Sequence, residues 1–186
     1  MTVWFTSDTY FGHVGILGSR MARPRPFKSI EEHDEVLVAR WNGRVRPGDQ
    51  VWHLGDFAYG ASAERCRDLF SRLAGKKHLV WGNHDNAREK ALSWASQQER
   101  ALVTVDGVSM VLGHYAQRVW YGMHRGDLHL YGHSHGSLPG TSASLDVGVD
   151  CWAWAPVQLS EIREALAETA ARKAGAKAAA ALAEAA

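Results

Sequence analysis

The chain has 186 residues, of which 46% are hydrophobic and 22% charged, as in a soluble globular protein with one domain and a buried core. Its 21 basic and 20 acidic residues leave a formal net charge of +1, so no overall field attracts nucleic acid or an acidic membrane. The absence of a secretory signal, of a long apolar run and of a CxxC pair at Cys66 or Cys151 predicts a cytoplasmic protein with two buried thiols and no membrane contact.

The first predicted strand covers residues 3–6, where VWFT is apolar, and it ends next to Asp8. Residues 14–28 contain glycines, prolines and three arginines, including Arg25, and are predicted to form a solvated loop. Ser29 begins the sequence SIEE, which has the form of a capping box, so a helix is predicted to follow it.

The middle of the chain repeats the pattern of an apolar strand followed by a polar turn. A strand at residues 50–54 ends at Gly55-Asp56, and an amphipathic helix follows it. Another strand at 77–81 ends at Gly82-Asn83-His84-Asp85. The segment 87–98 is predicted to be a helix.

The next two strands end in histidines. Residues 101–112 are predicted to form a hairpin, because an Asp-Gly pair separates two apolar runs, and the hairpin leads into Gly113-His114. The strand at 128–131 runs into Gly132-His133-Ser134-His135.

A last strand is predicted at residues 144–149, and the chain is predicted to be helical from Ser160 onward. After Lys173 the composition becomes rich in alanine, which favours helix by propensity alone. The predicted organisation is therefore one domain over residues 1–172 and a helical tail over 173–186.

Five predicted strands end in a glycine or serine beside Asp, Asn or His. Ligands bind at the carboxyl ends of strands in open α/β sheets, so these side chains are expected to meet. Carboxylate, amide oxygen and imidazole together suit first-row metal ions rather than a soft thiolate site. A carboxylate can bridge two ions, and two ions about 3.5–4 Å apart can clamp the attacking and leaving oxygens of a phosphoryl transfer.

The motifs SDTYFGH, GDFAY, GNHD, GHY and GHSH resemble, in this order, the five motifs of the calcineurin-like metallophosphoesterases. The resemblance covers residues 3–135, and SLDVGVDCW with PVQLSEI is similar to the end of the small bacterial and phage-type branch. It implies an α/β fold, a four-layer α/β/β/α sandwich of two mixed β-sheets with the metal site at one edge.

The resemblance also implies a role for each motif residue. Asp56 would bridge two metal ions, Asp8 and His135 would bind the first, and the second would be bound by Asn83, His114 and His133. His84 would be the catalytic imidazole beside the leaving oxygen, with Asp85 orienting it, in keeping with an imidazole outside the metal shell acting as a general acid.

Position 10 departs from the family, because the first motif is normally Asp-x-His and here the third residue is Tyr10. Tyr10 is the favoured ligand, as a phenolate that would select iron(III) with a divalent manganese, iron or zinc at the second site. Tyr59 is an alternative, since purple acid phosphatases use a tyrosine three residues after the bridging aspartate. In a further alternative both tyrosines pack, and His13 or no residue completes the site.

The predicted activity is hydrolysis of a phosphodiester or a phosphomonoester by a metal-bound hydroxide, with the diester favoured. The expected substrate is a small phosphate ester, with cyclic nucleotides among the candidates, and the near-zero net charge disfavours long nucleic acid. Two alternatives remain: a partly degenerate member that serves as a protein-binding scaffold, and a nuclease.

Overall fold

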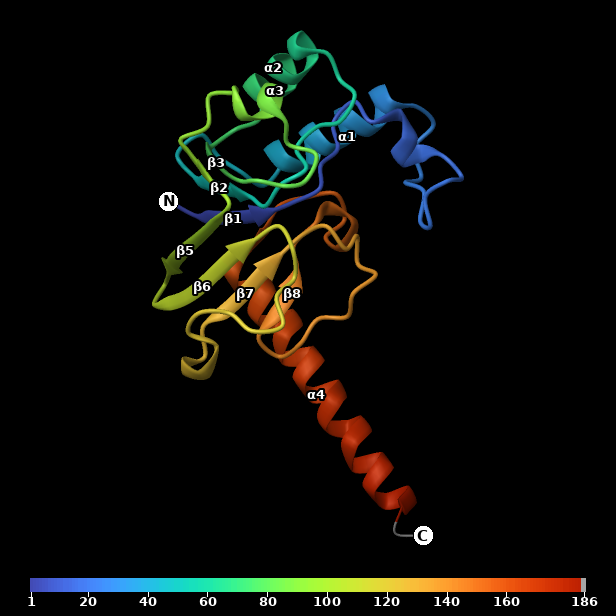
Figure 1. Cartoon of the computed structure of the whole chain (residues 1–186), viewed down its shortest axis with the longest axis vertical. Coiled ribbons are helices and arrows are strands. Elements are labelled where there is room, and N and C mark those ends of the chain that lie inside the picture. The colour runs from blue at the N-terminus through green and yellow to red at the C-terminus, as the bar shows by residue number, and fades with distance from the viewer. Residues whose placement is uncertain (185–186) are drawn as a thin grey trace.

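The computed structural model describes residues 1–184, and the last two residues of the predicted tail lie outside the described part of the chain. Within it two mixed sheets pack face to face, with the strand orders β4-β3-β2-β1-β9 and β5-β6-β7-β8. Helices lie outside both sheets (Figure 1). The predicted four-layer α/β/β/α sandwich is therefore confirmed.

The first sheet is built mainly from parallel strands. It contains β1 (Val3–Thr6), β2 (Gln50–His53), β3 (Lys76–Val80), β4 (Ser96–Gln98) and β9 (Val157–Gln158). Only β9 runs antiparallel, beside β1. The helices α1 (Ile30–Asn42), α2 (Ala63–Arg72) and α3 (Ala87–Lys90) lie on its outer side in Figure 1. Ser29 and Ser62 cap α1 and α2 by accepting hydrogen bonds from Glu32 N and Arg65 N, as local sequence dictates.

The second sheet begins with the predicted hairpin. Its strands are β5 (Arg100–Val105), β6 (Val108–Gly113), β7 (Leu128–Tyr131) and β8 (Ser144–Asp146). Asp106 and Gly107 both have positive φ, 47° and 76°, which is the turn that an Asp-Gly pair favours. Because β6, β7 and β8 are parallel, their carboxyl ends reach the same edge.

Two hydrophobic clusters hold the layers together. One lies between the first sheet and its helices and includes Leu37, Trp41 and Leu69. The other joins the two sheets and includes Phe5 and Leu112. Short 3-10 turns, η1 (Val14–Leu17), η2 (Met123–Arg125) and η3 (Val149–Cys151), occur in the loops. The hydrophobic clusters thus fix the sheets and helices, and the loops with these turns connect the ends of the strands.

The helix α4 (Leu159–Glu184) passes behind β7 and β8 and then extends away from the body (Figure 1). Its first turns bury Ile162 and Leu166, while residues 171–181 are exposed. The helix crosses the predicted boundary at residue 173 without a break, and the division into domain and tail stays a prediction. Over residues 1–184, no helix combines the length and apolar character that crossing a membrane requires.

The structure corrects the prediction of one helix and the predicted burial of one thiol. The helix predicted over residues 87–98 ends at Lys90, and Ser96–Gln98 form β4 instead. Pairing of β4 with β3 and packing of Trp94 against Phe57 and Phe70 outweigh the local propensity for helix. Of the two predicted buried thiols, Cys66 is buried, whereas Cys151 is exposed at the surface of η3.

Candidate metal centre

The polar residues at the strand ends adopt an unusual backbone conformation. Among the described non-glycine residues with positive φ, five are predicted ligands: Asp8 (58°), Tyr10 (50°), Asp56 (59°), His133 (65°) and His135 (47°). This left-handed region is disfavoured for residues with a Cβ, and such strain persists where the surrounding structure imposes it. Positive φ angles at five residues that follow strands indicate that this edge of the two sheets forms a functional site.

Asp56 is the residue on which the other groups converge. Its Oδ2 accepts a 2.6 Å hydrogen bond from the Tyr10 hydroxyl, and its Oδ1 accepts one of 2.9 Å from the backbone N–H of His84. His114 Nε2 lies 3.5 Å from Oδ2. Burial opposes ionisation of Asp56, but the contacts with His114 and Tyr10 outweigh it and hold its pKa at about 2.

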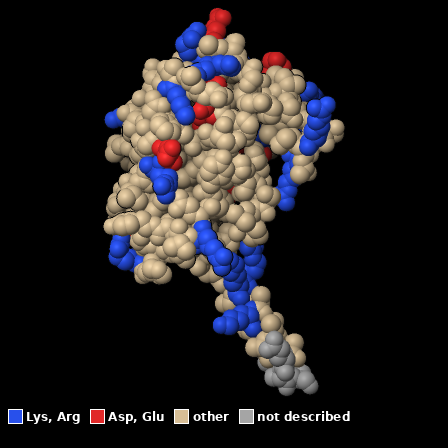
Figure 2. Space-filling view, in the orientation of Figure 1, with Lys and Arg blue, Asp and Glu red and all other residues tan. Residues whose placement is uncertain are grey.

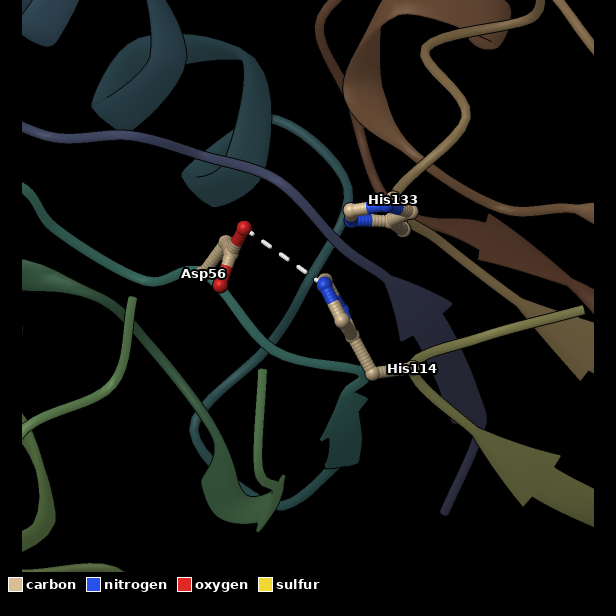
Figure 3. A group of neighbouring side chains, drawn as sticks. All are labelled: Asp56, His114 and His133. Carbon is tan, nitrogen blue, oxygen red and sulfur yellow. Dashed lines mark ion pairs between the residues drawn. The ribbon is translucent and has the colours of Figure 1, made fainter. Parts of the chain in front are cut away.

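Ligand atoms of Asp56, His114 and His133 all lie within 4.8 Å of one another, and Figure 3 shows the three side chains approaching from separate loops. His114 Nδ1 donates to the Leu54 carbonyl at 2.7 Å, so this nitrogen carries a proton. Its other nitrogen, Nε2, faces Asn83 Oδ1 at 2.9 Å as well as Asp56. Because Nε2 of His114 faces two oxygen atoms, either a proton on Nε2 or a bound cation must separate them. The carboxylate, amide and imidazole atoms gathered here are of the types that bind a metal ion.

A second set of ligand types adjoins Asp56 on the side of β1. Asp8 is fully buried, its Oδ2 accepts a hydrogen bond from His133 N, and its Oδ1 has no partner. Burial raises the Asp8 pKa to about 7, although His135 and His114 oppose the rise. A buried carboxylate oxygen without a partner is costly, and a bound cation would satisfy it. This unpartnered oxygen is therefore suited to contact a cation next to Asp56.

Two glycines allow the loops to come this close together. A Cβ at Gly82 would lie 2.2 Å from Asp56 Oδ1. A Cβ at Gly132 would lie 2.0 Å from Ser7 Oγ and 2.5 Å from Asp8 Oδ2. Any side chain at either position would displace a candidate ligand, which gives a physical reason for glycine in GNHD and GHSH.

The chain is similar to known proteins over most of its length. Residues 1–148 match the sequence profile of the calcineurin-like phosphoesterase superfamily domain. The chain belongs to this superfamily. Gene 66 protein of Mycobacterium phage D29 is 28% identical over 194 residues, a match that covers 87% of this chain and 94% of that protein. An uncharacterized protein of Methanocaldococcus jannaschii is 36% identical over 89 residues, 47% of this chain, and the match spans about half, 49%, of its length.

A solved structure has a similar fold. The protein of unknown function AQ665 from Aquifex aeolicus superposes with a TM-score of 0.67 over 88% of this chain and 98% of its own, at 21% identity. Membership of this superfamily supports a hydrolase of phosphate esters, and the family implies metal ions. The structure brings all seven predicted ligands of this phosphoesterase to one edge of the sandwich.

The three alternatives for position 10 differ in where their side chains lie. Tyr10 is 6% exposed, its hydroxyl reaches Asp56, and its ring centre lies 5.4 Å from that of His135. Burial and the neighbouring Asp56 raise the Tyr10 pKa above its usual value. Tyr59 is 41% exposed and packs on His84 and His13, with ring centres 4.6 and 4.8 Å away. The Tyr10 hydroxyl thus contacts the carboxylate that is predicted to bridge the metal ions, and Tyr10 remains the predicted ligand.

The carboxylate of Asp85, which is predicted to orient His84, contacts backbone groups. It accepts hydrogen bonds from the backbone N–H groups of Asp56, Phe57 and Gly82, at 2.8–3.0 Å, rather than from the His84 ring. Burial raises the Asp85 pKa, and these backbone bonds oppose the rise. Asp85 therefore holds together the two turns that carry Asp56 and Asn83.

Two carboxylates that shape the site are not among the predicted residues. Asp146 accepts hydrogen bonds from Ser134 Oγ and Gly136 N and so holds the GHSH loop. Asp150 accepts one from His135 Nδ1 at 2.8 Å. Both lie in SLDVGVDCW, where an apolar strand is again followed by glycine and aspartate. That repeated pattern is the signal that could have found Asp150.

Arg25 is a further residue that the sequence placed wrongly. It belongs to the loop predicted to be solvated, yet it is only 2% exposed. Its guanidinium lies over the Tyr10 ring, 5.8 Å from the centre, and donates to the Asp8 carbonyl. Arg25 can be buried because its guanidinium donates to acceptors that are distant in the sequence, and the composition of its own loop does not predict them.

Proposed function

We propose that this phosphoesterase is a dinuclear metal enzyme that hydrolyses phosphodiesters. The observation that carries the proposal is the convergence of two groups of ligand types on Asp56. Asp8, Tyr10 and His135 would hold the first ion, and Asn83, His114 and His133 the second. Such ions, when bound, would supply Lewis acidity and lower the pKa of a water to near neutrality.

Two residues of this chain would fix the ligands before reaction. The Leu54 carbonyl keeps the proton of His114 on Nδ1, which leaves Nε2 available on the side of Asp56 and Asn83. Asp85 holds the turn of Asp56 through backbone hydrogen bonds. Ligands held in advance do not have to be ordered when substrate binds.

His84 is suited to give a proton to the leaving oxygen. It is partly exposed, and its ring lies between those of Tyr10 and Tyr59, 5.5 and 4.6 Å away between centres. Its backbone N–H is bonded to Asp56, which keeps the imidazole next to the proposed centre. An imidazole in this place can act as a general acid.

The preference for a diester rests on a cavity beside the proposed second ion. This cavity has a volume of about 520 Å³, and Asn83 and His114 form part of its wall. Lys90, Arg100 and Tyr115 also line it. A diester would place its second substituent there, whereas a monoester has no group to fill it.

A small substrate fits the charge distribution better than a polymer. On the face drawn in Figure 2, the blue Lys and Arg side chains stand in separate places on the body, with several along α4. Binding a long nucleic acid requires cations that follow its phosphates. Small phosphodiesters, cyclic nucleotides among them, are therefore the proposed substrates.

Substrate preference is tested with matched pairs of compounds. Bis(p-nitrophenyl) phosphate should be hydrolysed with a higher kcat/KM than p-nitrophenyl phosphate, because only the diester fills the cavity. Assays of 2′,3′- and 3′,5′-cyclic nucleotides would then define the second substituent. Faster hydrolysis of the monoester would contradict the diester preference.

Metal content is tested by elemental analysis with an optical spectrum. We expect two ions per chain, with iron(III) at the Tyr10 side and a visible phenolate-to-iron band. Tyr10→Phe should abolish the band, and Tyr59→Phe, the matched control, should retain it. A colourless protein that is fully active with manganese alone would contradict the assignment of iron.

A further inference from the structure

The carboxylate of Asp150 determines which nitrogen of His135 carries the proton. Asp150 lies in η3, its side chain is 15% exposed, and its Oδ2 is 2.8 Å from His135 Nδ1. Both oxygens of Asp150 accept hydrogen bonds from the Arg25 guanidinium, at 2.9 and 2.7 Å, an arrangement that fits an ionised carboxylate. An ionised carboxylate only accepts hydrogen bonds, so Nδ1 must donate. The neutral ring then has its lone pair on Nε2.

Arg25 holds Asp150 and the first motif at the same time. Its Nε and Nη2 donate to the two carboxylate oxygens of Asp150 at 2.9 and 2.7 Å. Nη2 also donates to the Asp8 carbonyl at 2.6 Å, and Nη1 to the Thr9 carbonyl at 3.0 Å. A single buried cation thus joins the backbone at Asp8 to the carboxylate behind His135.

The remaining donor of Arg25 ties this pair to α1. Nη1 lies 2.8 Å from His33 Nε2, and His33 Nδ1 lies 3.0 Å from Asp34 Oδ1. Asp34 Oδ1 in turn accepts a hydrogen bond from the backbone N–H of Gly12. All five N–H groups of the Arg25 guanidinium are therefore used, a geometry that lysine cannot reproduce.

We propose that Asp150, held by Arg25, is the positioning carboxylate of the first metal site. It selects the His135 tautomer that can bind a metal through Nε2, and the shared Arg25 sets the separation between His135 and Asp8. A carboxylate behind a histidine ligand orients the ring and raises its basicity. The inference rests on the proposed metal centre, although the tautomer itself can be measured without metal.

The test is Asp150→Asn. An amide cannot accept from Arg25 and from His135 Nδ1 as the carboxylate does, because its N–H₂ would face either a donor of Arg25 or Nδ1. The change therefore loosens the hold on the His135 ring while nearly preserving the shape of the side chain. After removal of metal with chelator, titration with Mn²⁺ by calorimetry should find two ions on the wild type. The first-site affinity of the variant should fall about 10–100-fold, and the second site should be kept.

The matched control is Asp49→Asn. Asp49 is also a buried aspartate that accepts hydrogen bonds, from Thr2 N, Trp4 Nε1 and Arg46 N, but it lies at the start of β2, away from the site. This variant should lose stability without losing either metal. Binding of both ions by Asp150→Asn within about threefold of the wild-type affinities would overturn the proposal.

A measurement on metal-free wild-type protein keeps the proposal testable if the variant does not fold. Long-range ¹H–¹⁵N spectra should identify neutral His135 as the Nδ1–H tautomer. Finding Nε2–H would overturn the positioning role. A wild type that has the Nδ1–H tautomer but binds fewer than two ions would instead contradict the dinuclear function, so the two failures are distinguishable.

Discussion

At the scale of single residues, the proposed metal site depends on glycines whose backbone lies very close to the candidate ligands. Asp56 faces Gly82, and Asp8 faces Gly132, at distances that leave no room for a Cβ. Asp8 and Asp56 themselves have positive φ, so backbone strain and close packing occur at the same two residues. Substitution of one hydrogen by a methyl group should therefore be enough to disturb the site.

Gly132→Ala should disrupt the proposed first metal site. The added methyl would overlap Ser7 Oγ and Asp8 Oδ2, and relief of the overlap should move Asp8 and cost about 1–3 kcal/mol of stability. We expect phosphodiesterase activity to fall by about two orders of magnitude, because displacing a group of the reaction centre by about 1 Å can cost about a hundredfold in rate. Steady-state kinetics and metal analysis would measure the effect.

Gly48→Ala is the matched control for this prediction. A Cβ at Gly48 would meet nothing within 4 Å, and the residue lies in the turn before β2. Activity and metal content should remain at wild-type values. Equal losses in both variants, or none in Gly132→Ala, would show that the close contact has no role.

At the scale of elements, β7 carries a histidine that must stay neutral in the folded state. His129 is fully buried, Nδ1 donates to the Val111 carbonyl at 3.0 Å, and Nε2 accepts the N–H of Gln117 at 3.0 Å. A proton on Nε2 would break the second bond. Burial lowers the His129 pKa, and the hydrogen bond to the Val111 carbonyl only partly offsets this effect.

This arrangement predicts acid sensitivity of β7 and its neighbours. Below a pH near ~6.5 the unfolded chain binds a proton at His129 that the folded chain excludes, so stability falls as pH falls, by at most about 1.4 kcal/mol per pH unit. His129→Gln should be less stable at neutral pH but should flatten this slope between pH 7 and 5. Urea unfolding at several pH values would measure it, and parallel curves would contradict it.

The outer part of α4 should contribute little to the domain. Residues 171–181 are exposed, whereas Ile162 and Leu166 belong to the buried hydrophobic cluster that includes Phe5 and Leu112. A chain that ends at Lys173 should keep its activity and its free energy of unfolding within about 0.5 kcal/mol. A chain that ends at Ala165 removes Leu166 and should lose about 2–3 kcal/mol, comparable to burial of one leucine. Thermal melts would compare the two, and a large loss in the longer chain would contradict the division at residue 173.

At the scale of the whole molecule, the site joins the two sheets. Asp8 and Asp56 follow strands of the first sheet, while His114, His133 and His135 follow strands of the second. Ions bound between them would link the two sheets and would be absent from the unfolded chain. Metal binding should therefore stabilise the folded molecule.

Addition of Mn²⁺ to chelator-treated protein should raise Tm. At a free concentration about 100 times Kd, one ion contributes about 2.7 kcal/mol, which corresponds to a rise of about 5–10 °C for a chain of this size. Asp56→Asn, which lacks the central carboxylate, should show little or no rise. The same rise in both proteins would place the stabilising ion elsewhere.

Much of this site could be predicted from the sequence because its signals are local. Apolar runs that end beside Asp56, His114 and His133 predict strands with ligands at their carboxyl ends, and capping serines predict where α1 and α2 begin. The type of ligand and its place after a strand are properties of a few neighbouring residues. The order of the motifs then identifies the fold.

Only the tertiary structure decided which residues hold the ligands in place. Arg25 and Asp150 are 125 positions apart, and Asp85 reaches the backbone of Asp56 across 29 positions. The strand β4 exists because β3 offers an edge, against the helical tendency of its own sequence. Such contacts depend on how distant segments pack. The sequence alone therefore predicted the candidate ligands, whereas the folded chain determined which residues support them and why Arg25 is buried.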